Sequence, residues 1–165
     1  MTVVLPDPEV LCAELVRQLK PQATADTALV GIHTGGVWLA ERLHTALGIA
    51  LPLGQLDISF YRDDFDKTGL HPQIKPTQIP FEVNGRHIVL VDDVLYTGRT
   101  VRGAMNELFD YGRPASISLA VLIDRGGREL PVAAQYIGAR LEVPSGGMLV
   151  LDRDENGKLR LKFDA

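Results

Sequence analysis

Two adjacent carboxylates and a loop of hydroxyls and glycine are the residues of this chain that most clearly point to chemistry. Asp92 and Asp93 follow the apolar run 88–91 and precede Tyr-Thr-Gly-Arg-Thr at 96–100. The run is typical of a buried strand, and residues 100–111 carry apolar side chains at helical spacing. The aspartates and the loop are therefore expected at the carboxyl end of a strand, where open α/β sheets bind ligands.

The loop itself predicts an anion site. Backbone N–H groups at a helix N-terminus bind phosphate, Thr97 and Thr100 add hydroxyls, and Gly98 permits close approach of the backbone. Asp92 and Asp93 repel a phosphate, so they are expected to accept hydrogen bonds from vicinal hydroxyls or to bind a phosphate-bound Mg²⁺. A phosphate beside a sugar diol is a ribose 5-phosphate. The alternative is a plain strand end, with solvated aspartates and a threonine that caps the helix.

Residues 88–100 resemble the signature of type I phosphoribosyltransferases that binds 5-phosphoribosyl 1-diphosphate (PRPP). The stretches 31–36, 59–64, 111–116 and 124–131 extend the likeness to the PyrR family, pyrimidine operon attenuators that also have uracil phosphoribosyltransferase activity. The resemblance spans about residues 8–140. It implies a parallel sheet flanked by helices, with a small hood.

The resemblance also implies roles for individual residues. Asp92 and Asp93 would be the catalytic residues, which hold the ribose hydroxyls directly or through Mg²⁺. The site for PRPP and its 5′-phosphate would comprise Val91, Val94, Leu95, Tyr96, Thr97, Gly98, Arg99 and Thr100. The pyrophosphate loop would comprise His33, Thr34, Gly35 and Gly36, with a cis peptide between Thr34 and Gly35. The base pocket would include Asp124, Arg125, Tyr136 and Ile137, and a flexible loop at 62–80 with Arg62 would cover the site.

The pyrophosphate loop departs from the family pattern. Many relatives carry Lys and Arg where this chain has His33 and Gly35. The loss of two fixed cations leaves pyrophosphate affinity and catalytic rate open. His33 is equally well interpreted as a hydrogen-bonded surface histidine. Similarly, the Gly-rich segment at 124–131 is either part of the base pocket or a turn held by pairing of arginine with Glu129.

The elements around these residues alternate between strand and helix patterns. Asp7-Pro8-Glu9 combines the N-cap residue, first-turn proline and acidic residue of a helix start. Apolar runs and stop signals predict strands at 28–33, 53–61, 86–91, 116–123 and 132–137, and helices at 8–20, 37–47 and 100–111. This alternation predicts an α/β fold with a parallel sheet core. The length of 165 residues fits one domain over 1–165.

The C-terminal tail predicts a β-hairpin. Apolar residues alternate on two arms around Asn156-Gly157, a pair typical of a type I′ turn. Lys158, Arg160 and Lys162 share the opposite face of the second arm. That face is either a solubilising strand edge or an RNA contact. The net charge of −4 gives the whole chain no attraction to nucleic acid.

Composition excludes several classes of protein. The single cysteine, Cys12, allows no internal disulfide. No apolar run approaches the roughly 20 residues of a membrane span, and acidic residues such as Glu9 and Glu14 near the N-terminus do not fit a secretory signal. These features predict a cytoplasmic protein.

The leading interpretation is a transferase that moves the 5-phosphoribosyl group of PRPP onto N1 of uracil and gives UMP and pyrophosphate. The partners implied by the resemblance are PRPP, uracil, UMP or UTP, pyrophosphate, Mg²⁺ and further copies of the chain in a homodimer or larger oligomer. One alternative is an RNA-binding regulator that senses UMP or UTP and binds a pyrimidine-operon leader. Others are a catalytically weak nucleotide sensor acting through protein partners, and a phosphoribosyltransferase for another base.

Overall fold

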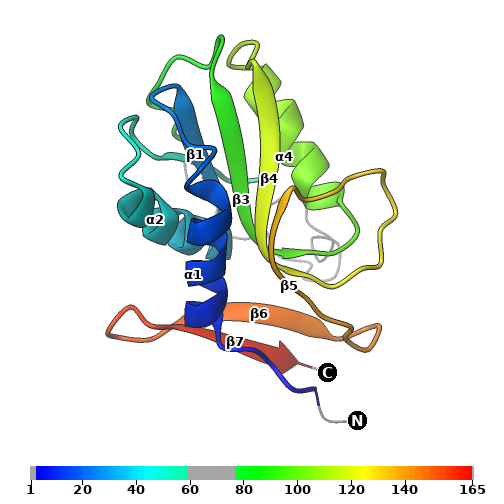
Figure 1. The fold of residues 1–165 in the computed structure, drawn as a ribbon. Coiled ribbons are helices and arrows are strands. Elements are labelled where there is room, and N and C mark those ends of the chain that lie inside the picture. Colours follow the sequence, from blue (N-terminus) through cyan, green and yellow to red (C-terminus); the bar gives the residue numbers. More distant parts are fainter. Residues whose placement is uncertain (1–2, 59–76, 165) are drawn as a thin grey trace.

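Five parallel strands form the central sheet, in the order β2-β1-β3-β4-β5, and two further strands form an antiparallel hairpin (Figure 1). The computed structural model describes residues 3–58 and 77–164. The elements are α1 (Pro8–Leu19), β1 (Thr27–Ile32), α2 (Gly35–Leu47), β2 (Gly54–Leu56), β3 (His87–Leu95), α4 (Arg99–Phe109), β4 (Ser116–Asp124), β5 (Tyr136–Arg140), β6 (Met148–Arg153) and β7 (Leu159–Asp164). The predicted α/β fold with a C-terminal hairpin is confirmed.

Helices cover both faces of the sheet, which is why its central strands are apolar on both sides. Helices α1 and α2 pack with the hairpin on one face, and α4 packs on the other. Residues 88–91 of β3 are all buried, as expected for a parallel strand between two helical layers. The Asp7 side chain accepts the Glu9 N–H and caps α1, and Gly48 ends α2 in the left-handed conformation.

The strand order places a ligand crevice between β1 and β3. From β1 the chain crosses to β2 on one side, and β3 then pairs with β1 on the other, with Gly31 opposite Val91. Strand order therefore reverses between these two strands. In open α/β sheets such a switch point is where ligands bind, at the carboxyl ends of the strands.

Several predicted boundaries were wrong. Strand β3 continues to Leu95, so Asp92 and Asp93 lie within the strand, where they face Val121 and the end of β4. Strand β2 spans Gly54–Leu56, and the following Asp57 N–H bonds to the Thr77 hydroxyl; positions 59–61 of the predicted strand lie outside the described residues.

Strand β5 begins at Tyr136, four residues later than predicted. The side-chain oxygen of Gln135 accepts the Leu119 N–H at 2.8 Å, and the Val132 carbonyl accepts Arg128 Nε. Side chains therefore take the bonds that a longer strand would have made.

The hairpin turn also differs from the prediction. No residue other than glycine has a positive φ in the described ranges, so Asn156 does not adopt the conformation that a type I′ turn requires. Instead, the Asp154 carbonyl accepts the Gly157 N–H, and the Asp154 carboxylate accepts the N–H groups of Asn156 and Lys158. Because the Asp154 carboxylate accepts these two N–H groups, the connection is wider than a two-residue type I′ turn. Within the described residues, no helix is long and apolar enough to cross a bilayer.

Candidate active site

Glycines of the loop after β1 lie directly against the aspartates of β3. A Cβ on Gly35 would overlap the Asp93 carboxylate, and one on Gly36 would lie 2.5 Å from the Val91 carbonyl oxygen. At Gly36 the clash would be with backbone, and at Gly35 a side chain would displace the Asp93 carboxylate. The two loops that the sequence analysis assigned to pyrophosphate and ribose are therefore adjacent in the structure.

The two carboxylates are oriented by their own backbone. One oxygen of Asp92 accepts the Asp93 N–H at 2.9 Å, and one oxygen of Asp93 accepts the Val94 N–H at 2.8 Å. Asp92 is only 6% exposed, whereas Asp93 is half-buried. Fixed, acceptor-only groups at a strand end are suited to binding hydroxyls or a cation.

The loop after β3 leads into the N-terminus of α4, as predicted. Gly98 has a φ of 97° and provides the left-handed turn that starts the helix at Arg99. The Thr97 hydroxyl accepts the Arg99 N–H at 3.2 Å, and Thr97 is 6% exposed. The first N–H groups of a helix have no partner within the helix, so this N-terminus presents donors and a positive dipole to an anion.

Residues 128–130, in the segment after β4, donate hydrogen bonds to the loop that joins β3 to α4. The Thr97 carbonyl accepts the N–H groups of Glu129 and Leu130, at 2.9 and 3.1 Å, and the Tyr96 carbonyl accepts Arg128 Nη1 at 2.7 Å. The sequence left this segment as either part of the base pocket or a turn held by pairing of an arginine with Glu129. Its hydrogen bonds to the carbonyls of Tyr96 and Thr97 were not predicted, because they join segments that are distant along the chain.

Asp124 and Arg128 form the ion pair that anchors this segment. Arg128 Nη2 lies 2.6 Å from Asp124 Oδ2, and their side chains are 25% and 11% exposed. Burial alone raises the pKa of Asp124, but hydrogen bonds from Arg128 and the Gly126 N–H outweigh it and lower the pKa. Glu129 pairs at 2.8 Å with Arg99 of α4, and not with an arginine of its own segment as the alternative interpretation required.

Arg125 stacks on the Tyr96 ring in the loop that joins β3 to α4. Its guanidinium lies 4.0 Å from the centre of the Tyr96 ring and donates to the carbonyls of Pro144 and Gly147. Gly127 has no Cβ, which leaves room for the same ring. Arg125 therefore lies at the carboxyl edge, as predicted, but its polar contacts tie Tyr96 to the segment before the hairpin.

The structure does not bring Tyr136 to this edge. Tyr136 is the first residue of β5, and its ring lines a cavity with the first residues of β3 and β4. The backbone of Ile137 exchanges two hydrogen bonds with the side chain of Gln18 on α1. The face of the sheet onto which a strand residue projects depends on the register of that strand with its neighbours, and the sequence does not specify this register.

His33 ends β1 and contacts β2. Its Nε2 lies 3.0 Å from Gln55 Oε1, and its N–H donates to the Leu56 carbonyl. The cis peptide bond lies between His33 and Thr34, one residue before the predicted position. Sequence reasoning missed Gln55, whose only signal is a polar side chain in a short apolar strand.

The backbone groups of Gln55 and Gln78 exchange two hydrogen bonds, one in each direction. Arg62 and positions 62–76 of the predicted loop lie outside the described residues.

Comparisons with known proteins agree with this geometry. Residues 6–143 match the model of the phosphoribosyl transferase domain family. The "Bifunctional protein PyrR" of Nitrosococcus oceani is 56% identical over 135 residues, which is 81% of this chain and 76% of the relative. The protein of the same name from Pseudomonas syringae pv. syringae is 49% identical over 96% of this chain and 95% of its own.

Solved structures give the same fold. A hypoxanthine phosphoribosyltransferase from Staphylococcus aureus superposes with a TM-score of 0.66 over 90% of this chain and 81% of its own, at 24% identity. At this identity the likeness concerns the fold alone. The family match and the close curated relatives show more: this chain belongs to the phosphoribosyl transferase domain family and, within it, to the PyrR proteins.

Proposed function

We propose that this protein transfers the 5-phosphoribosyl group of PRPP to N1 of uracil. The bond from C1′ of the ribose to the diphosphate oxygen breaks, the bond from C1′ to N1 forms, and the N1 proton leaves, so that UMP and pyrophosphate result. The observation that carries the proposal is the contact between the two strand-end loops: Gly35 and Gly36 lie against Asp92 and Asp93, beside the N-terminus of α4.

Each part of this edge suits one part of the substrate. The N–H groups at 98–100 and the Thr97 hydroxyl would bind the 5′-phosphate, next to the positive end of α4. Asp92 and Asp93 would accept the ribose hydroxyls. Positive charge develops on the ribose as the leaving diphosphate departs, and two nearby carboxylates stabilise that charge. The protein would therefore act by positioning reactants and by electrostatics, and among the described residues no side chain stands out as a general base for the N1 proton.

The residues present fit a magnesium ion that arrives with PRPP. Mg²⁺ is commonly held by one or two carboxylates together with substrate phosphates and water. Asp92 and Asp93 supply two carboxylates, and no cluster of three or more metal-binding side chains occurs among the described residues. When bound, the ion would neutralise the diphosphate leaving group. Asp92 and Asp93 would hold it, directly or through water.

The choice of base is tested by PRPP consumption with uracil, guanine, hypoxanthine or orotate as acceptor. We expect turnover with uracil and little with the other three. Preferential turnover of a purine would contradict the choice of uracil and leave the phosphoribosyl transfer intact. No PRPP consumption with any base, together with tight UMP binding, would favour a nucleotide sensor that acts through protein partners.

We also propose a second function, RNA binding that depends on UMP, because the curated relatives are named bifunctional. The hairpin contributes less to it than its sequence suggests. Lys162 pairs with Asp152 at 2.9 Å, and Arg160 pairs with Asp154 at 3.5 Å, so the basic face of β7 is largely neutralised within the hairpin.

RNA binding would therefore require cations aligned by an oligomer. The test is gel-shift binding of a pyrimidine-operon leader RNA, with and without UMP, beside a scrambled RNA at several salt concentrations. We expect affinity for the leader to rise with UMP and to fall with salt, by a log–log slope of roughly −0.7 per neutralised phosphate. Equal binding of both RNAs, independent of UMP, would reject this second function.

A further inference from the structure

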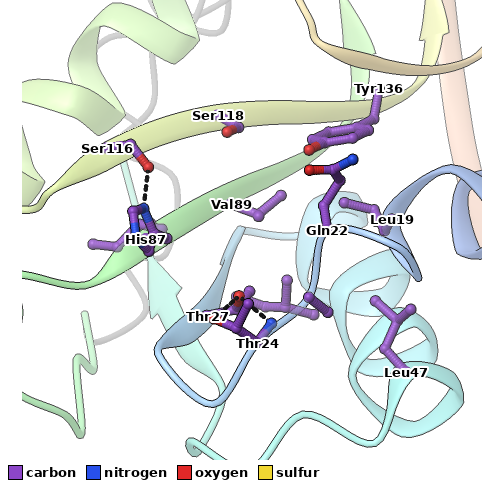
Figure 2. Close-up of a pocket in the computed structure, with 13 residues that line it drawn as sticks. Leu19, Gln22, Thr24, Thr27, Leu47, His87, Val89, Ser116, Ser118 and Tyr136 are labelled. Atoms are coloured by element: carbon purple, nitrogen blue, oxygen red, sulfur yellow. Dashed lines mark hydrogen bonds between the residues drawn. The ribbon is translucent and has the colours of Figure 1, made fainter.

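A second cavity lies at the amino ends of the strands, at the other edge of the sheet from the candidate active site. Four of its lining residues are the first residues of their strands: Thr27 of β1, His87 of β3, Ser116 of β4 and Tyr136 of β5. The volume is about 260 Å³, slightly below the range of pockets that bind drug-sized ligands. Figure 2 shows these side chains around one open space.

One side of the cavity is apolar, and the other carries polar groups that have no hydrogen-bond partner in the described part of the chain. Leu29 and Val89 supply aliphatic surface from the sheet. The Tyr136 ring stands over the cavity with the amide of Gln22 beside it, and the Ser118 hydroxyl points from β4 toward the same space (Figure 2). Among the described residues, the Ser118 hydroxyl, the Tyr136 hydroxyl and the Gln22 amide make no hydrogen bond. A flat ring with a polar edge could stack on the tyrosine and satisfy these groups.

The charges around the cavity narrow the class of ligand that it can bind. None of the described residues that line it is Asp, Glu, Lys or Arg. Two lining residues, Leu19 and Leu47, are the last residues of α1 and α2. Helix C-termini carry the negative end of the helix dipole, which disfavours an anion. A phosphate ester is therefore disfavoured here, in contrast to the carboxyl edge, where the N-terminus of α4 favours one.

We propose that this amino-edge cavity binds an uncharged, flat heterocycle of the size of a nucleobase or nucleoside. The tyrosine ring would stack on the heterocycle, and the hydroxyl of Ser118 and the amide of Gln22 would bond to its polar edge. Strand β3 joins the two sites, because His87 lies at the cavity and the Asp92–Asp93 pair lies near the other end of the same strand. The proposal does not depend on the acceptor base of the transferase.

The test follows backbone amide signals of the isotope-labelled full chain by NMR during titration with uridine, adenosine, UMP or methyl glucoside. We expect at least one nucleoside to shift the amides of Ser118 and Tyr136 saturably. UMP should shift the amides of 96–100 instead. Methyl glucoside tests whether the site takes any neutral polyol.

Two variants and a control locate the ligand. Ser118→Ala removes the hydroxyl and its hydrogen bond without adding bulk, so nucleoside affinity should fall about 2- to 10-fold. Ala23→Phe places a ring at the cavity lining and should abolish binding. Thr45→Val removes an exposed hydroxyl of α2 outside the cavity and should change nothing. Unchanged signals at 96–100 show that each variant is folded.

Several results would overturn the proposal. These are no shift at the cavity with any nucleoside, equal binding of methyl glucoside, unchanged affinity in Ser118→Ala, or binding that survives Ala23→Phe. If a second copy of the chain covers this face, the cavity amides will shift with protein concentration and not with nucleoside, which would also overturn it. Failure of UMP to shift 96–100 would contradict the proposed transferase site and leave the cavity result unaffected.

Discussion

Replacement of Arg128 by alanine should both destabilise the fold and loosen the phosphate loop. Arg128 donates to the Tyr96 carbonyl at 2.7 Å, to the Val132 carbonyl at 2.9 Å and to the Asp124 carboxylate at 2.6 Å. Removal of one partner from a buried ion pair costs about 3–5 kcal/mol. Because the Arg128 side chain is 25% exposed, water compensates part of this loss. We expect Arg128→Ala to lower the free energy of unfolding at neutral pH by about 2–4 kcal/mol.

The pH dependence identifies the Asp124 carboxylate as the cause. The pKa of Asp124 is lowered in the folded protein, so the stability it contributes is present above its unfolded pKa and is lost as pH falls through the folded value. In Arg128→Ala, burial still disfavours the charged carboxylate while the arginine is gone, so the pKa of Asp124 rises. Protonation of Asp124 then removes the unpaired buried charge and reduces the destabilisation of the variant. The stability difference between the two proteins should therefore be largest near neutral pH and shrink on acidification.

Urea unfolding at several pH values measures the stability, and calorimetric titration with UMP measures the phosphate site. UMP affinity should fall in Arg128→Ala, because the Tyr96 carbonyl loses its anchor, and recover partly in Arg128→Lys. Arg17→Ala is the matched control, since its partner Glu14 lies on the surface of α1 and exposed ion pairs contribute little to stability. A stability loss no larger than that of the control, or an unchanged affinity for UMP, would refute the reasoning.

Three further predictions concern the site and the hairpin. Thr97→Ala should weaken UMP binding roughly 10- to 100-fold by calorimetry, the range for a hydrogen bond to a charged group, and unchanged affinity would reject the phosphate assignment. Asp92→Asn combined with Asp93→Asn should lower kcat strongly while thermal unfolding changes little, because amide oxygens can still accept the local N–H groups; turnover at the native rate would reject the ribose assignment. The hydrogen bond from Arg42 lowers the pKa of Glu9, so its contribution exists above pH 4.5 and is lost as pH falls through the folded pKa. Glu9→Gln should therefore cost about 0.5–1 kcal/mol near neutral pH and nothing in acid, as measured by urea unfolding.

The part of the site that the sequence predicts is the part whose geometry is local. Asp92, Asp93 and the loop at 96–100 are adjacent along the chain, and their hydrogen bonds join residues one or two positions apart. A buried strand followed by a glycine turn and a helix leaves these residues little choice of position. The turn at Gly35 and Gly36 was predictable for the same reason, because a buried strand precedes it and a helix pattern follows.

The remaining features depend on contacts between distant segments. Arg128 supports the Tyr96 carbonyl from 32 positions away, and Gln55 reaches His33 from 22 positions away. The face onto which Tyr136 projects follows from its pairing with Ala120, and a shift of one residue would reverse it. The resemblance placed Tyr136 and Ile137 at the base without this register. The structure has the Tyr136 ring in the cavity with the first residues of β3 and β4, whereas Ile137 pairs with Val121, which also pairs with Asp92.

Helix polarity explains why the two edges of one sheet carry different chemistry. In a parallel sheet, every strand-to-helix connection emerges at the carboxyl edge, so the N-terminus of α4 and the first turn of α2 lie there with their N–H groups toward ligand. The last residues of α1 and α2 lie at the amino edge, where the dipole ends are negative. Phosphates are thus directed to the carboxyl edge by the backbone alone, before any side chain contributes. In the proposed function the aspartates would then restrict which phosphate ester fits, and the amino-edge cavity, whose lining has no Asp, Glu, Lys or Arg, would be left to ligands that the helix dipoles do not attract.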